Sequence, residues 1–404
     1  MEPTDEHIGA RVRYWRERRK LPRKQFADMV GRSTSWLDKI ESGERELVRL
    51  PMIERVAEAL GIDPAVLTDE PSAQRAQQCV DACEVQAIRR ALAAYPGLNT
   101  GTPEAVDLGQ VTAQASYLDH AWMTSRFTVV ARHLPTLMAE AQTALQTAAG
   151  ADEVAAYRVL VTTYRLASSM LLKFEANDIA WLAADRAMHT AMQAGDTWSL
   201  ARATRSVARA MTSIHEQTQA IATLLAMADQ MRHEVSGNAE QLLSLYGMLY
   251  LAASITAAGQ EDAGLARDMH DAAMAAARRY EPHYNDHHTF FGLTNTQIHR
   301  VAALVRLREC GHALEFAGTI SPEAVAALSA ERQSNYLLDL TEAHTGVGNY
   351  RQAVRMLVRA EQIAPEEVRC RPLAHGLLRS LLGNTTGESA QLARQVAIRA
   401  GVEA

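Results

Sequence analysis

The chain has 404 residues and a formal net charge of −6 at pH 7; 48% of its residues are hydrophobic, 22% are charged and only 5% are aromatic. This length allows more than one domain, and a composition rich in helix-forming residues favours an all-α fold. We find no apolar run as long as a membrane span and no signal segment, so we expect a cytoplasmic protein without membrane contact. The four cysteines form no CxxC pair, and we expect no metal and no other cofactor.

The first expected helix runs from about Asp5 to Lys20. Ile8, Val12 and Trp15 recur at i, i+4 and i+7, which predicts a stripe that faces a core. The opposite face is basic and comprises Arg11, Arg13, Arg16, Arg18, Arg19 and Lys20. Such a face is either solvated or a source of contacts to phosphate.

Two short helices are predicted next, over Arg23 to Val30 and Ser33 to Ser42. Ala27 is small where the helices would cross, and Gly31 supplies the positive φ of a tight turn. Leu37 and Ile40 pin the second helix onto the first, and Ser33 or Arg32 caps its start. This arrangement predicts a helix-turn-helix.

The outer face of the second helix carries side chains that can exchange hydrogen bonds with base edges in a major groove, namely Thr34, Ser35, Asp38 and Lys39. Arg32, Arg45 and Arg49 flank this helix and are expected to contact phosphate. Trp36 has two interpretations: it packs beside Ile40, or it lies against a sugar or a thymine methyl group.

The stretch PRKQFADMVGRSTSWLDKIESGER, with its flanks, closely resembles the Cro/lambda-repressor-like (Xre) helix-turn-helix family over residues 5 to 70. The resemblance implies DNA binding and further phosphate contacts by Arg23 and Gln25. It departs from the family at Leu21-Pro22, where a Ser or Thr cap is more usual. Leu50, Ile53, Val56, Leu60, Ile62 and Leu67 are expected to complete a five-helix domain over residues 1–72.

The charge distribution agrees with a DNA-binding end. Between Arg11 and Arg49 there are twelve Lys or Arg and six Asp or Glu, so this segment carries +6 and the remainder about −12. A local basic patch on an acidic body attracts phosphate at one end and limits non-specific adhesion elsewhere.

A connecting helix and linker are expected over residues 73–103, and a helical-repeat domain over residues 104–404. The clearest repeat spans residues 336 to 365 and resembles a tetratricopeptide repeat (TPR). Gly348 to Tyr350 forms its turn, and Ala353, Leu357 and Ala360 give the small-large-small spacing of its second helix. Thr341 and His344 depart from the usual small residue and Tyr.

Fainter copies precede this unit. Taking one alanine in each second helix as a marker gives steps of 40, 46, 47 and 40 residues, longer than the roughly 34 residues of a standard repeat; the markers are Ala180, Ala220, Ala266, Ala313 and Ala353. The series favours a TPR-like α-solenoid over a closed bundle.

A solenoid offers a concave surface formed by the first helix of each repeat, which suits a peptide or small-molecule effector. The polar residues that we expect to face it are Tyr164, Arg205, Tyr246, Tyr250, Asn295 and Asn335. The segment HYNDHHTFFG, which includes His283, His287 and His288, has three interpretations: a metal site, a ligand contact or the start of an ordinary helix.

These features predict a transcriptional regulator that binds a pseudo-palindromic double-stranded DNA operator as a homodimer, under the control of an effector. The alternative is a DNA-tethered adaptor whose repeats recruit a protein partner. No Gly-rich phosphate loop, HExxH or GxSxG sequence is present, so we do not expect an enzyme.

Overall fold

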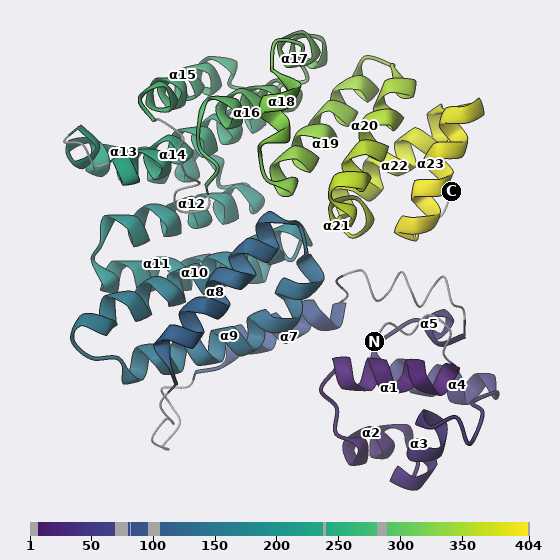
Figure 1. Ribbon diagram of the computed structural model, residues 1–404. Coiled ribbons are helices and arrows are strands. Elements are labelled where there is room, and N and C mark those ends of the chain that lie inside the picture. Colours follow the sequence, from purple (N-terminus) through teal and green to yellow (C-terminus); the bar gives the residue numbers. More distant parts are fainter. Residues whose placement is uncertain are drawn as a thin grey trace. The chain divides into compact units, whose positions relative to one another are not determined.

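The structure is a computed structural model that describes residues 7–68, 80, 82–95, 106–236, 240–280 and 289–402. All regular elements of these residues are helices. The chain divides into two compact units, Met1–Cys83 and Glu84–Ala404 (Figure 1). The expected helix-turn-helix lies in the first unit and the expected repeats lie in the second.

The first unit contains the five predicted helices: α1 (Ile8–Arg18), α2 (Arg23–Val30), α3 (Thr34–Glu41), α4 (Leu50–Leu60) and α5 (Pro64–Thr68). Its core gathers around the fully buried Trp15 and Phe26 and includes Leu37 and Ile40. One predicted core residue is misplaced: Leu50 is 61% exposed, because it begins α4 and points away, whereas Leu47 in the preceding loop is buried.

The second unit begins with α7 (Ala82–Ala93), whose first two residues precede its boundary, and its described residues continue as seven helical hairpins. The hairpins are α8 (Leu108–Met123) with α9 (Phe127–Thr147), α10 (Ala151–Lys173) with α11 (Asn177–Ala194), α12 (Thr197–Ser213) with α13 (Gln217–Ser236), α14 (Glu240–Gly259) with α15 (Ala263–Arg279), α16 (Leu293–Arg306) with α17 (Cys310–Ala317), α19 (Ala330–Gly346) with α20 (Tyr350–Ile363), and α22 (Pro372–Asn384) with α23 (Gly387–Ala400). The short helices α18 (Pro322–Ala326) and α21 (Pro365–Arg369) lie between hairpins. The predicted helical-repeat solenoid is confirmed.

Small residues and a common turn explain the regular stacking. The five marker alanines lie on second helices and are all buried, so neighbouring helices can approach closely. Six of the hairpins turn through one residue with positive φ; these residues are Ser125, Glu175, His215, Glu261, Arg308 and Gly348. After each of them, the next backbone N–H bonds to a carbonyl five residues back, which closes the helix end.

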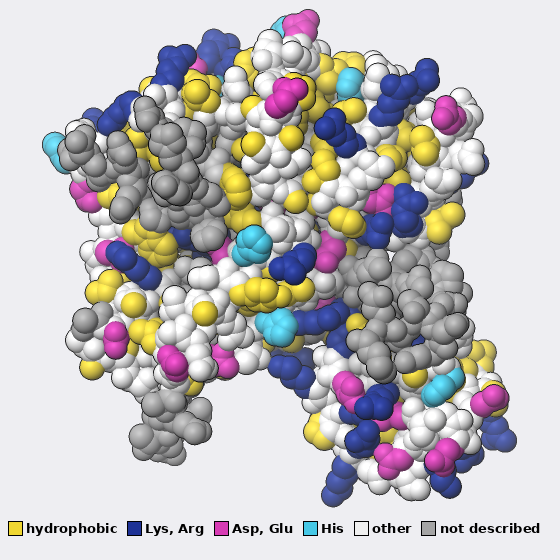
Figure 2. Space-filling model, in the orientation of Figure 1, with side chains coloured by type: hydrophobic (Ala, Val, Ile, Leu, Met, Phe, Trp, Pro, Cys, Tyr) yellow, Lys and Arg dark blue, Asp and Glu magenta, His cyan; other side chains and the backbone are white. Residues whose placement is uncertain are grey.

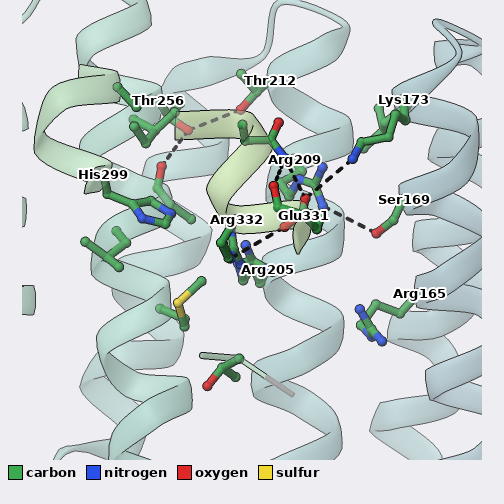
Figure 3. Close-up of a pocket in the computed structure, with 18 of the residues that line it drawn as sticks. Arg165, Ser169, Lys173, Arg205, Arg209, Thr212, Thr256, His299, Glu331 and Arg332 are labelled. Atoms are coloured by element: carbon green, nitrogen blue, oxygen red, sulfur yellow. Dashed lines mark hydrogen bonds and ion pairs between the residues drawn. The ribbon is translucent and has the colours of Figure 1, made fainter. Parts of the chain in front are cut away.

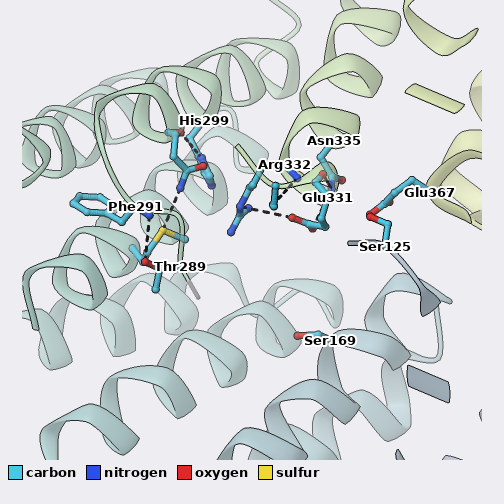
Figure 4. Close-up of polar contacts among 12 residues, drawn as sticks. Ser125, Ser169, Thr289, Phe291, His299, Glu331, Arg332, Asn335 and Glu367 are labelled. Carbon is cyan, nitrogen blue, oxygen red and sulfur yellow. Dashed lines mark hydrogen bonds and ion pairs between the residues drawn. The ribbon is translucent and has the colours of Figure 1, made fainter. Parts of the chain in front are cut away.

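The two ends of the array meet within the second unit. The backbone N–H and hydroxyl of Thr128, in the first turn of α9, donate to Glu366 of α21 at 2.8 and 2.9 Å. The Ser125 hydroxyl donates to Glu367 at 3.3 Å (Figure 4). Lys173 Nζ lies 2.5 Å from the same carboxylate. We call these contacts the seam; they join residues 194 to 242 positions apart, so the solenoid curls onto itself.

One helix of the described residues, α14, is long and apolar enough to cross a membrane. Its window Leu242–Gly259 has a mean hydropathy of 1.5, which corrects our expectation that no apolar run reaches that length. However, 67% of this window is buried inside the second unit, where α14 packs against α13 and α15. An apolar sequence and extensive burial together are typical of a core helix.

Candidate nucleic-acid interface and effector cavity

The turn between α2 and α3 has the predicted geometry. Gly31 adopts φ 68°, and the N–H of Arg32 bonds to the carbonyl of Ala27, which ends α2. Ser33, rather than Arg32, caps α3: its hydroxyl accepts from the Trp36 N–H at 3.1 Å. Because Ser33 of the turn bonds to the backbone of α3, the turn fixes where this helix begins and its direction.

The face of α3 opposite the core is solvent-exposed. Leu37 and Ile40 are fully buried, whereas the four residues that we expect to read bases are exposed, namely Thr34, Ser35, Asp38 and Lys39. Lys39 forms no ion pair with a described residue. Asp38 lies 3.3 Å from Arg23 Nε. The structure therefore places these side chains together on one accessible strip.

The five residues expected to contact phosphate are also exposed, namely Arg23, Gln25, Arg32, Arg45 and Arg49. Arg23 uses its Nε for Asp38 and for Glu41, at 3.3 and 3.4 Å, while its two terminal nitrogens form no hydrogen bond with a described residue. Arg32 and Arg45 line one shallow hollow beside Trp36, whose ring lies 5.9 Å from the Arg32 guanidinium. In Figure 2 the N-terminal unit shows basic side chains interleaved with acidic ones.

One member of the basic face of α1 is not a surface residue. Arg16 is buried and pairs with the buried Glu41 at the end of α3, at 2.5 Å from Nε and 3.0 Å from a terminal nitrogen. Its other terminal nitrogen donates to the Leu21 carbonyl at 3.1 Å. Hydrogen bonding to Glu41 raises the pKa of Arg16 above its ordinary value. Arg16 thus fastens α3 to α1 and is not available to phosphate.

Arg11 of α1 and Arg19, which caps the end of this helix, also have structural partners. Arg11 donates to the Leu67 carbonyl at 3.0 Å, and Arg19 donates to the Leu60 carbonyl at 3.1 Å. Trp36 is half-buried and packs against the core cluster that includes Ile40, which is the first of its two interpretations. The accessible basic surface is accordingly narrower than the sequence indicates and lies mainly on α2, on the turn and on the loop after α3.

The second unit contains a cavity of about 450 Å³ within its curl. Most of its lining comes from the first helices of the hairpins, α8, α10, α12, α14, α16 and α19, which confirms the expected role of these helices in the concave surface. Arginine is the commonest polar residue of the lining; the basic side chains are Arg165, Lys173, Arg202, Arg205, Arg209, Arg306, Arg332 and Arg371. Figure 3 shows Arg205 near Arg332, and Arg209 near Glu331.

Carboxylates neutralise part of this charge. Asp119 pairs with Arg165 and lies 3.7 Å from Arg202, while Glu367 pairs with both Lys173 and Arg371. Glu331 lies 3.4 Å from Lys173 and 3.6 Å from Arg332. Burial alone would raise the pKa of Glu331, but these and other cations lower it to about 2.

Two further titratable groups, Asp339 and His299, line the cavity. Burial raises the pKa of Asp339 to about 6; Glu342 acts in the same direction, while Arg306 at 3.9 Å and Arg371 oppose it. Burial lowers the pKa of His299 to about 3, with the charges of Arg332, Arg205 and Arg306 acting in the same direction, so this imidazole is neutral. Its Nδ1 lies 2.7 Å from the Asn295 carbonyl, which can only accept a hydrogen bond.

The six residues expected to face an effector do not lie together. Arg205 and Asn335 line the cavity, and Asn335 accepts from Arg371 at 2.8 Å. Asn295 is fully buried, and its amide donates to the Met248 sulfur at 3.7 Å. The three tyrosines lie outside the lining: Tyr164 binds Gln142, and Tyr246 and Tyr250 contact each other.

Sequence reasoning overlooked most of the cavity arginines. A signal was present in α12, where Arg202, Arg205 and Arg209 follow at i, i+3 and i+7, which places them on one face. The described residues contain no group of three or more His, Cys, Asp or Glu that could hold a metal ion. The histidines of HYNDHHTFFG, His283, His287 and His288, lie outside the described residues.

Comparison with known proteins supports the assignment of the first unit. A helix-turn-helix domain family matches residues 7–70, so the N-terminal unit is a helix-turn-helix domain. No curated protein matches the chain. A crystal structure of Bacillus thuringiensis PlcR in complex with the peptide PapR7 and DNA is similar at 15% identity and a TM-score of 0.33, over 70% of this chain and 99% of that chain. A TM-score of this size does not establish a common arrangement, and the effector has to be argued from the residues of the cavity.

Proposed function

We propose that this protein is a cytoplasmic transcriptional regulator that binds a pseudo-palindromic operator as a homodimer and is controlled by an effector in the cavity of its second unit. The observation that carries the proposal is the exposed polar strip of α3. This strip is held on a buried scaffold inside a domain that belongs to the helix-turn-helix class.

The proposal assigns two kinds of contact to two groups of residues. Lys39 and the hydroxyls of Thr34 and Ser35 read base edges, because they stand on the exposed face of a helix that fits a major groove. Arg45 and Arg49 contact phosphates and set the register of the helix, because they are exposed on the loop that leaves α3. A two-fold dimer then requires half-sites about 34 Å, or a multiple of that distance, apart.

The effector acts only if it binds the DNA-competent and DNA-incompetent states with different affinity. The cavity is a suitable sensor because its lining comes from six hairpins and from both sides of the seam. A ligand that contacts α10, α12 and α19 at once would change the relative positions of these hairpins. The repeats also contribute the dimer contacts in this proposal.

The test compares DNA binding of four full-length proteins by fluorescence anisotropy over a series of salt concentrations. Lys39→Ala is expected to change sequence preference, with a loss of about 1–3 kcal/mol at the base that it reads. Arg49→Ala is expected to weaken binding to all sequences equally and to reduce the salt slope by about 1.

Arg355→Ala is the matched control, because Arg355 is an exposed arginine on the second helix of a hairpin. It should leave both the preference and the slope of the parent unchanged. An equal loss on all sequences for Lys39→Ala would refute the assignment of base readout, and an unchanged salt slope for Arg49→Ala would refute the phosphate assignment.

A further inference from the structure

The cavity holds more positive than negative charge. Among the described residues, eight arginine and lysine side chains line it, against two carboxylates, Glu331 and Asp339. Asp119 and Glu367 supply negative charge from behind the lining, but each is shared between two cations. An enclosed surface with this imbalance attracts anions, because burial weakens the screening of its charges.

Arg205 is the cavity cation whose charge is least compensated by its neighbours. It forms no ion pair or hydrogen bond with any described residue, and its Nε is buried without a partner. Burial lowers the pKa of Arg205 well below its ordinary value, and repulsion from Arg209, Arg332 and Arg165 acts in the same direction. The attraction of Glu331 is weaker than each of these repulsions. A guanidinium whose Nε is buried without a partner, among other cations, is costly for the folded protein unless something else compensates it.

Neighbouring groups complete a cradle. Arg209 donates to the Ser169 hydroxyl at 3.3 Å, and burial lowers its pKa to about 10. The buried Nε of Arg332 lacks a hydrogen-bond partner, although its guanidinium lies 3.6 Å from Glu331. Arg205 and Arg209 stand one turn apart on α12, and Arg332 approaches from α19. Three guanidinium groups from two helices therefore surround a common space (Figure 3).

Apolar side chains form a second part of the lining. Helix α14 contributes Leu245, Met248, Leu251 and Ile255, and α16 contributes Ile298 and Ala302. The cavity volume lies within the range of pockets for small organic ligands, roughly 300–1,000 Å³. Such a lining accommodates a molecule with a compact anionic head and an apolar body.

We propose that the cavity binds a small organic anion whose phosphate or carboxylate group is held by Arg205, Arg209 and Arg332, with its apolar part against α14 and α16. This inference names the chemistry of the effector and so rests on the proposed sensory role of the second unit. Its test measures ligand binding without DNA, so that failure of this inference and failure of the proposed function are distinguishable. Guanidinium groups suit phosphate and carboxylate equally well, because both accept paired N–H donors.

The probes are octyl phosphate and octanoate, which share an apolar tail and differ in the anionic head, with octanol as the neutral control. Each is added to the full-length protein below its micelle concentration and at matched ionic strength. Thermal denaturation and calorimetric titration are recorded for each. At a concentration well above the dissociation constant, an anionic probe should raise the midpoint of the second unit by roughly 2 °C or more, and octanol should not.

A response to octyl phosphate alone identifies a phosphoryl ligand, and a response to octanoate alone identifies a carboxylate such as a fatty acid or a peptide C-terminus. A response to both supports the shared chemistry. If neither anion raises the midpoint above the value with octanol, the inference is wrong.

Arg205→Met separates a ligand-binding role from a structural one. Because it removes a buried charge without a partner, it should raise the midpoint of the ligand-free protein and weaken binding of the responding anion about 10- to 100-fold. Arg399→Met is the control: Arg399 pairs with Glu361 at 2.5 Å outside the cavity. It should lower the midpoint and leave the anion response intact.

If Arg205→Met does not fold, Arg205→Lys keeps the charge but loses the fork of donors, and it should still weaken binding. An anion response that survives unchanged in the folded Arg205 variant would overturn the assignment, as would a lower midpoint of ligand-free Arg205→Met.

Discussion

Replacement of Arg16 by methionine should unfold much of the DNA-binding unit. Glu41 would remain with its side chain 3% exposed, and among the described residues its single remaining cation would be Arg23, at 3.4 Å. Removal of one partner from a buried ion pair costs about 3–5 kcal/mol, because the other charge stays desolvated. A unit of about 60 residues has a total stability of about 3–9 kcal/mol. The expected loss is therefore a large part of the free energy of unfolding of the first unit.

The assay is hydrogen exchange of the full-length protein in increasing urea, read by mass spectrometry from peptides of residues 8–68. These peptides report the first unit without interference from the repeats. The double variant Arg16→Met with Glu41→Leu removes both charges and should recover most of the loss, since an apolar pair of similar volume is tolerated at such sites.

Arg13→Met is the matched control, because Arg13 forms an exposed i, i+4 pair with Glu17 and such pairs contribute little. A cost below about 1 kcal/mol for Arg16→Met, or a double variant no more stable than the single one, would refute the reasoning that α1 positions α3 through this pair.

Three further changes test other parts of the structure. Gly9→Ala should abolish DNA binding, because the added Cβ would lie 1.7 Å from the Ile40 carbonyl oxygen and force α1 away from α3; normal affinity would contradict that contact. Ser33→Ala should cost about 1 kcal/mol in urea unfolding of the first unit, through loss of the bond from the Trp36 N–H, and no cost would disprove the cap. Asp339→Asn should be increasingly more stable than the parent as pH rises from about 4 to 6. The folded state raises this pKa from 3.8 to about 6 and therefore loses stability over that range; a thermal midpoint difference independent of pH would contradict this.

The helix-turn-helix could be predicted from sequence because each of its features is local. Gly31 needs a positive φ, Ser33 caps the next turn, and Leu37 with Ile40 shows the helical period. Arg16 was misjudged because its type suggests a surface position. Its spacing, four residues after Val12 and one after Trp15, already placed it on the core side of α1.

The repeat with glycine in its turn was the clearest one in the sequence. Gly348 marks the clearest unit, whereas five equivalent turns use Ser125, Glu175, His215, Glu261 and Arg308, residues that seldom adopt positive φ. The alanine spacing identified the second helices nonetheless, because close packing depends on small side chains whatever the turn contains.

The seam and the cavity could not be predicted, because they depend on how much each hairpin rotates relative to the next. Lys173 and Glu367 are 194 residues apart, and no local sequence pattern around either residue predicts their contact. The rotation of the hairpins also decides which arginines of α10, α12 and α19 converge on the cavity. Without knowledge of that rotation, a periodic row of arginines in the sequence indicates only a solvated helix face.

The most direct test of the account is selection of bound sequences from random duplex DNA by the full-length protein, with its mass in solution measured alongside. The account predicts enrichment of a pseudo-palindromic site and the mass of a dimer. If no site is enriched by the protein, whether alone or with an anionic probe that binds the cavity, the regulator proposal is contradicted and a DNA-tethered adaptor becomes the better interpretation.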